Sequence, residues 1–279
     1  MGIRVGLFLL LGLQPMAAAA AIVLAFADVA AAQQQHRCHG AQRIDSPIDL
    51  ARPAPAGPFQ LTTEQVFLIQ GPKESVAHQK VRWAYDVERR GGGYLQKMRL
   101  VEALTNGKRL ELAPGSPAEG MELDVQLSSA MAVEDTKIRH PAMNSLSPTQ
   151  WRATQAAIKV MAQKLIDGLD FRIDNIRTGD AILRAKISMP AIGKMTEQYD
   201  LEMVGTVVGL KPYRGQDYVC VDLGIKAYMR DGQLVGSGHM LIDPKNVWRS
   251  ISSTTLQGNL AARDGTRVQV LATEARTPD

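Results

Sequence analysis

Apolar and polar residues alternate one by one over much of the chain, which is the period of a β-strand with one buried face. The clearest case runs from Tyr218 to Arg230. One parity of this stretch is apolar throughout: Val219, Val221, Leu223, Ile225, Ala227 and Met229. The same alternation occurs in 81–88 and 121–128. Parallel strands are covered on both faces and carry continuous apolar runs, so one-sided burial predicts a mainly β fold built from antiparallel strands.

Turn signals separate these strands. Asn106-Gly107 and Asp231-Gly232 tolerate the positive φ that tight hairpins require, and Asp243-Pro244-Lys245-Asn246 predicts a further turn. The C-terminal part is therefore expected to be a meander, with strands near 197–210, 217–230, 233–243 and 247–257. Strands of ten or more residues are longer than usual, which predicts a large, curved antiparallel sheet.

One segment carries helical signals instead. Ser147, Pro148 and Gln150 form a capping-box arrangement with proline at the first helical position. After them, apolar residues recur at helical spacing: Trp151, Ile158, Met161, Leu165 and Leu169. This predicts one amphipathic helix over about 148–168, packed on the sheet, because the sheet is the only apolar surface predicted elsewhere. The expected fold class is therefore α+β, mainly β.

The first residues have the pattern of an export signal. A single Arg4 precedes an apolar stretch, and Ala30-Ala31-Ala32 supplies small residues at the end. We expect residues 1–32 to be a signal peptide cleaved near Ala32/Gln33, and the protein to be periplasmic or secreted. The alternative is an uncleaved membrane anchor, because the apolar run of about 20 residues is long enough to span a bilayer.

Three regions are expected in the chain as a whole. After the signal peptide, 33–58 is rich in glutamine and proline, which predicts an extended or disordered arm. Residues 59–279 are expected to form the β-rich domain. Its strand-rich halves, 59–140 and 170–279, would be joined by the helix, and the sequence leaves open whether they form one sheet or two.

Composition and charge narrow the class of partner only slightly. The 279 residues are 22% charged and 45% hydrophobic, which excludes wholesale disorder and a polytopic membrane protein. The net charge is only +4, and an exported chain meets no chromosomal DNA, so nucleic acid is not expected. Lys97 and Arg99 are at alternate positions of one predicted strand and so point to the same face. The same is true of Lys226 and Arg230. If these faces adjoin, they form a basic stripe for an anionic envelope surface; the alternative is that the lysines protect sheet edges.

The chain has two cysteines, Cys38 and Cys220, and export would place them where disulfides persist. A bridge would tie the proline-rich arm to the C-terminal sheet, and two free thiols are the alternative. Cys220 shares the polar parity of its strand with Asp222 and Lys226, so its sulfur is expected outside the core.

No residue pattern identifies a catalytic or metal site. His36, Cys38 and His39 are close in sequence but have no further ligand nearby. Gly236-Ser237-Gly238 lies in a predicted strand, where glycine indicates a bulge or a close approach of another chain. We therefore expect no catalytic residue, cofactor or metal. An enzyme would require distant groups to meet in one cleft, the candidates being His78, His140, His239, Asp222 and Asp243.

Three functions remain open. The leading hypothesis is a non-enzymatic, exported binding or accessory protein of the cell envelope, with an anionic surface, a lipid or another envelope protein as partner. In architecture alone, an exported chain of long antiparallel strands with a covering helix resembles the periplasmic lipoprotein and lipid carriers, in which helices close a curved sheet over an apolar cavity. That resemblance implies the second hypothesis, a carrier of a lipid or other hydrophobic ligand between sheet and helix. The third is a hydrolase with a site assembled from distant loops.

Overall fold

Fifteen strands make up almost all of the regular structure in the described residues. The computed structural model describes residues 38–50, 57–70, 75–113, 116–129, 133–140, 149, 152, 169–172, 174–189, 199–229, 232–261 and 267–278. The strands are β1 (Phe59–Gln70), β2 (Ser75–Arg90), β3 (Gly93–Thr105), β4 (Lys108–Arg109), β5 (Glu111–Ala113), β6 (Ser116–Pro117), β7 (Glu122–Leu127), β8 (Val133–Arg139), β9 (Leu169–Phe171), β10 (Ala181–Met189), β11 (Tyr199–Tyr213), β12 (Gln216–Met229), β13 (Gly232–Ile242), β14 (Ile251–Ala261) and β15 (Arg267–Pro278). A short 3-10 helix, η3 (Val247–Arg249), precedes β14.

The mainly β, antiparallel prediction is confirmed. Thirteen strands form one sheet in the order β8-β7-β3-β2-β1-β15-β14-β13-β12-β11-β10-β9, with β4 paired to β3, and β5 and β6 form a small second sheet. Every pairing is antiparallel. We call β1–β3, β7 and β8 the N-terminal limb, and β9–β15 the C-terminal limb.

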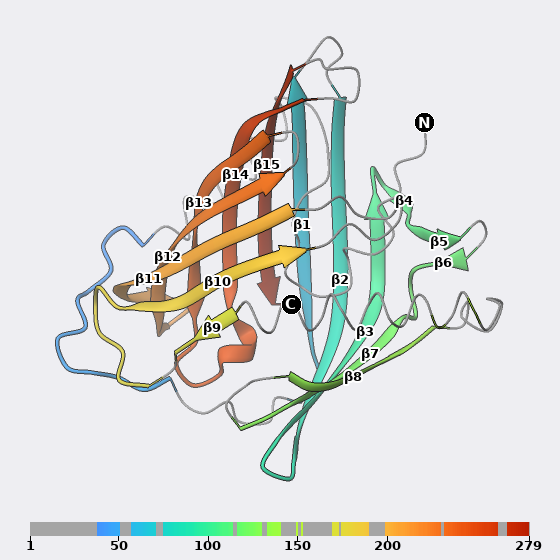
Figure 1. Cartoon of the computed structure of the whole chain (residues 1–279). Helices are drawn as coiled ribbons and strands as arrows, with labels where there is room; N and C mark the ends of the chain where they lie inside the picture. Colours follow the sequence, from blue (N-terminus) through green and yellow to red (C-terminus); the bar gives the residue numbers. More distant parts are fainter. Residues whose placement is uncertain are drawn as a thin grey trace.

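The two limbs meet where the last strand pairs with the first. β15 lies beside β1 over ten register pairs, from Leu61 opposite Pro278 to Gln70 opposite Gln269. Figure 1 shows the sheet strongly bent, with β10–β13 running at a steep angle across β1 and β2. The bend turns one face of both limbs inward.

The core lies inside this bend and draws on both limbs. Trp83 and Leu123 of the N-terminal limb belong to the same buried cluster as Ile187 and Val221 of the C-terminal limb. The row that alternation assigned to the buried face is indeed buried, since Val219, Val221, Leu223, Ile225 and Ala227 are all at most 6% exposed. We call this face of the sheet the inner face, and the opposite one the outer face.

Glycines let neighbouring strands come unusually close in the bent region. A Cβ added at Gly236 would lie 1.9 Å from the carbonyl oxygen of Thr255 on β14, and one added at Gly238 would lie 2.3 Å from that of Ser253. This confirms the interpretation of Gly236-Ser237-Gly238 as a close approach of another strand.

The part of the proline-rich arm that the structure describes, 38–50, packs against the sheet. Residues 38–50 run around the end of the C-terminal limb (Figure 1), and Gln42 forms an isolated bridge with Leu210 of β11. A Cβ at Gly209 would lie 2.1 Å from the carbonyl oxygen of Gln42, so the arm depends on a glycine there. Ile44 and Leu50 then enter the core at 5% and 1% exposure. Pro47 does not prevent this, because 38–50 makes few backbone hydrogen bonds to the strands and is held by its apolar side chains.

The expected amphipathic helix is not supported. Of 148–168, only Thr149 and Arg152 are described, both with helical backbone and exposed side chains. The remainder, including Trp151, Ile158 and Leu165, lies outside the described residues, as do the signal peptide 1–32 and its cleavage point. The last strand of the predicted meander also begins later than expected, since 247–249 is η3 and β14 starts at Ile251.

Candidate functional site

The outer face of the N-terminal limb carries charges in strips of alternating sign. On β2 the outward residues Asp86 and Glu88 are acidic, and on β3 Lys97 and Arg99 are basic. The next two strands repeat this order: Glu122 and Asp124 on β7, and Lys137 and Arg139 on β8. The register sets unlike charges side by side, in the rows Asp86–Lys97–Asp124–Lys137 and Ala84–Arg99–Glu122–Arg139. We call this surface the charged face.

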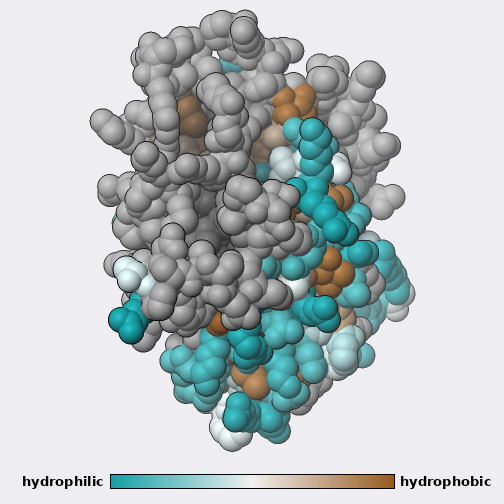
Figure 2. Space-filling view, turned by 90° about the vertical axis from the view of Figure 1, so that its right-hand side faces the viewer, coloured by the Kyte–Doolittle hydropathy of each residue, from teal (hydrophilic) through white to brown (hydrophobic). Residues whose placement is uncertain are grey.

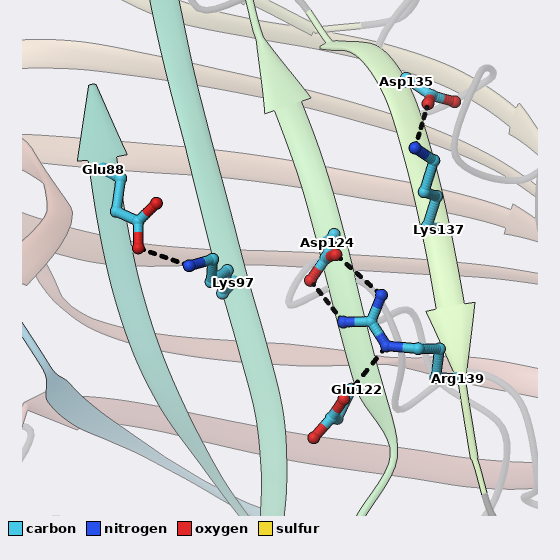
Figure 3. Close-up of polar contacts among 7 residues, drawn as sticks. All are labelled: Glu88, Lys97, Glu122, Asp124, Asp135, Lys137 and Arg139. Carbon is cyan, nitrogen blue, oxygen red and sulfur yellow. Dashed lines mark hydrogen bonds and ion pairs between the residues drawn. The ribbon is translucent and has the colours of Figure 1, made fainter. Parts of the chain in front are cut away.

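Most charges on this face have a partner in an adjacent strip (Figure 3). Arg139 donates two hydrogen bonds to Asp124, of 2.9 and 3.1 Å, and one of 3.2 Å to Glu122. Lys97 pairs with Glu88, and Lys137 lies 3.8 Å from Asp135 on its own strand. The forked contact between Arg139 and Asp124 is the strong geometry for a guanidinium and a carboxylate.

A groove of about 240 Å³ lies on the charged face. Ala84 contributes a small side chain to a row whose other members are long, and this leaves room above the sheet. We call it the Ala84 groove; its lining residues are Pro58, Ala84, Tyr85, Asp86, Lys97, Met98, Arg99, Glu122, Asp124 and Arg139. Seen from the side of the molecule that carries β3–β8, the described surface is mostly hydrophilic, with isolated hydrophobic residues (Figure 2).

Ion pairing stabilises the charged form of two cations of the groove, Lys97 and Arg139. The hydrogen bond to Glu88 raises the pKa of Lys97, with smaller contributions from Asp86 and Asp124. The hydrogen bonds to Asp124 and Glu122 raise the pKa of Arg139. Both shifts raise the pKa further above physiological pH, so Lys97 and Arg139 stay protonated there. A general base or acid needs the opposite, a pKa brought close to the working pH.

The two predicted disulfide residues do form a bond, between Cys38 and Cys220. Cys220 lies on the outer face, as its parity indicated, yet it is completely buried. Together with Tyr218, Leu241 and Ile251 it forms a small cluster beneath the arm. The expectation that the Cys220 sulfur lies outside the core was therefore wrong, because the position of a residue along a strand tells which face its side chain is on but not what covers that face.

Of the sequence cluster His36, Cys38 and His39, His36 lies outside the described residues and Cys38 is in the disulfide. A disulfide sulfur is not the thiolate that a metal site uses. Within the described part of the chain, no group of three or more histidine, cysteine or acidic residues is placed to hold a metal ion.

Two of the five candidate catalytic residues are neighbours. Asp222 on β12 lies opposite His239 on β13, and Ser253 on β14 lies opposite His239 on its other side. The types are those of a catalytic triad, but Ser253 and His239 are only 4% and 7% exposed. Because β14 pairs with both β13 and β15, its backbone N–H groups belong to the sheet and leave none for an oxyanion hole. The row is not the cleft that the hydrolase hypothesis requires.

The other three candidates lie apart from this row. His78 is exposed on β2, where its backbone N–H donates to Asn106. His140 follows β8 and contacts the carbonyl oxygen of Glu119 at 3.3 Å. Asp243 is in the predicted turn, accepting 2.8 Å from the backbone N–H of Lys245 and 3.3 Å from the amide of Gln216. These contacts stabilise the turn, so Asp243 has a structural role.

The basic stripe is not formed in the described residues. Lys97 and Arg99 are on the N-terminal limb, flanked on both sides by the acidic strips of β2 and β7, whereas Lys226 is on β12. Sequence reasoning noted some of these positions singly but missed the strips. The signal was present over short stretches: 86–88, 97–99, 122–124 and 137–139 each carry two like charges at alternate positions, and the sign changes from strand to strand in spatial order.

The comparisons with known proteins add no family. The chain matches no family model, and no curated protein is similar to it in sequence. The disulfide between Cys38 and Cys220 is consistent with an oxidising, exported environment. No helix in the described ranges is both long and apolar enough to cross a membrane.

Proposed function

We propose that this chain is an exported, non-enzymatic binding protein of the cell envelope, processed near Ala32/Gln33 and periplasmic, which contacts its ligand or partner through the Ala84 groove. The observation that carries the proposal is the electrostatic state of the groove. Two of its three cations, Lys97 and Arg139, are hydrogen-bonded to carboxylates that raise their pKa, so both are fixed charges. Fixed charges in a concave surface recognise charged groups, whereas proton transfer requires titratable ones.

The test is native mass spectrometry of the protein purified from its source envelope without detergent exchange. We expect a bound species that survives in a Gly224→Leu variant and is lost from an Ala84→Leu variant, whose new side chain fills the groove. Gly224 is a matched control because it faces outward on β12 with nothing within 4 Å of an added Cβ. A species kept by both variants, or lost from both, contradicts a role for the groove.

The same measurement separates the other two hypotheses. A co-purified lipid that Ala84→Leu does not displace favours the hypothesis of a carrier that binds its hydrophobic ligand elsewhere than in the groove. A co-purified ester or amide that the protein cleaves on incubation favours the hydrolase. A processed protein with no bound species in any preparation overturns the proposal.

A further inference from the structure

The groove contains one cation and one anion that the protein leaves open. Lys97 is paired with Glu88, and Arg139 is paired with Glu122 and Asp124. Among the described residues, Arg99 and Asp86 have neither an ion pair nor a side-chain hydrogen bond, although both line the groove. Arg99 is opposite Ala84 on one side and opposite Glu122, already engaged by Arg139, on the other. The carboxylate nearest to Arg99 across the strand pair is therefore already bonded to another guanidinium.

Arg99 and Asp86 stand on adjacent strands as diagonal neighbours. Asp86 is opposite Lys97 and Ala84 is opposite Arg99, so the open charges are offset by one row. Diagonal positions of an antiparallel pair are about 7–8 Å apart. A ligand with two opposite charges a few ångströms apart can satisfy both side chains while it lies over Ala84.

The charge balance of the groove selects for such a ligand. Three acids (Asp86, Glu122, Asp124) and three bases (Lys97, Arg99, Arg139) line it, so its formal charge is zero. A simple anion that approaches Arg99 also meets Glu122 and Asp124, and a simple cation that approaches Asp86 also meets Lys97. A group that is itself neutral overall, but carries one charge of each sign, avoids both penalties.

We infer that the Ala84 groove binds a small zwitterionic group, an oxyanion held by Arg99 joined through a short linker to a primary ammonium held by Asp86. A carboxylate or a phosphodiester has the oxygen geometry that a guanidinium fork accepts in a bidentate manner. The ammonium donates hydrogen bonds to the Asp86 carboxylate, which a trimethylated ammonium cannot do. This inference rests on the proposed function, because it names the ligand class of the same groove.

The experiment is a calorimetric titration of the purified processed protein with glycerophosphoethanolamine, which carries a phosphodiester and a primary ammonium. We expect saturable binding, and binding about tenfold weaker for glycerophosphocholine, which has the same anion without an N–H donor. Ethanolamine and dimethyl phosphate supply the two charges separately and should each bind more weakly still. Equal binding of the choline and ethanolamine compounds overturns the assignment of Asp86.

Variants locate the site. Arg99→Gln, Asp86→Asn and Ala84→Leu should each abolish measurable binding, while Gly224→Leu should leave it unchanged. Because all four residues are on the outer face of the sheet and outside the buried core, near-ultraviolet circular dichroism is expected to match the parent protein. If a variant loses this spectrum, the double variant Asp86→Arg/Arg99→Asp is used in its place. It exchanges the two charges between the strands and keeps both, so it should bind the same compound. Failure of that pair to bind, with a native spectrum, contradicts the inference.

Vesicle flotation distinguishes a free compound from a lipid headgroup as the source of the zwitterion. Co-flotation with vesicles of phosphatidylcholine and phosphatidylethanolamine, but not with phosphatidylcholine alone, assigns the headgroup; titration without co-flotation assigns the free compound. If the envelope protein retains a groove-dependent partner but binds none of these compounds, the ligand class is wrong and the proposed function stands.

Discussion

Asp222 is a side chain whose charged form is disfavoured by its position on the sheet. It lies on the outer face of β12 opposite His239, and the partial loss of water around it there raises the pKa of its carboxyl group. No cation is among the causes of the shift. Arg139 is the opposite case, because two carboxylates surround it and stabilise its charge.

The first prediction follows from Asp222. A carboxyl whose pKa is raised on folding holds its proton more tightly in the folded protein, so stability falls as pH rises from 3.8 to the raised pKa. Above that window the whole penalty is present. Asp222→Asn removes it, so we expect the variant to be more stable than the parent at neutral pH and equal to it below pH 3.8.

Urea denaturation across this pH range measures the effect. Asp200→Asn, at an exposed position on the neighbouring strand β11, serves as the control and should change little. A parent protein more stable than Asp222→Asn at neutral pH would mean that Asp222 makes a favourable contact in its charged form.

At the scale of elements, the described part of the arm is held to the sheet by several separate contacts. It is bound by the disulfide at Cys220, by the bridge between Gln42 and Leu210, and by the burial of Ile44 and Leu50. The backbone N–H of Ile44 also donates to the Thr178 hydroxyl at 2.8 Å. These contacts are at both faces of the sheet, so the arm wraps around the end of β11 rather than lying on one surface.

Gly209→Ala tests the close approach of the arm. The methyl group would meet the carbonyl oxygen of Gln42 at 2.1 Å, so the arm must move, and we expect a loss of about 1–3 kcal/mol in unfolding free energy. Gly224→Ala on the adjacent strand meets nothing within 4 Å and should stay within about 0.5 kcal/mol of the parent. Chemical denaturation measures both, and equal stability of the two variants would show that the arm does not depend on Gly209.

The disulfide provides a second test of the arm. It closes a sequence separation of 182 residues, and removing such a native bond typically costs about 2–5 kcal/mol. We expect the double variant Cys38→Ala/Cys220→Ala to unfold at correspondingly lower denaturant concentration. The parent under reducing conditions should move to the same midpoint, and an unchanged midpoint in either would mean that the arm is held by its other contacts alone.

The whole molecule depends on the pairing of its two ends. The paired residues of β1 and β15 are about 200 positions apart in sequence, and yet the two strands lie at the centre of the sheet, where they join the limbs. Contacts of such long range cost loop-closure entropy before they form, so we expect slow folding. They also make the limbs one cooperative unit, because the buried cluster draws residues from both.

Deletion of residues 267–279 tests this dependence. It removes β15, and β1 and β14 each lose ten register partners, so we expect loss of the native near-ultraviolet circular dichroism and of dispersed amide signals in nuclear magnetic resonance. Addition of a synthetic peptide 267–278 should restore part of the signal. A truncated chain that melts cooperatively near the temperature of the parent would show that one limb folds without the other.

Much of the fold was predictable because its signals are local. Alternation located the row from Val219 to Ala227 on the buried face, and Asn106-Gly107 located a turn with the positive φ that its sequence permits. The site was less predictable. The charges at Lys97 and Arg99 were visible, but that Asp86 and Glu122 flank them depends on which strands are neighbours.

The amino-acid sequence by itself determined which residues extend, which face of each strand is apolar and where the chain turns, because these follow from side-chain period and local backbone preference. Only the tertiary structure decided that both strand-rich halves form one sheet, that β15 closes against β1, and that the arm buries Cys220. The physical reason is that parity assigns a side chain to a face, whereas the neighbour across the strand and the cover above it come from residues far away in the chain.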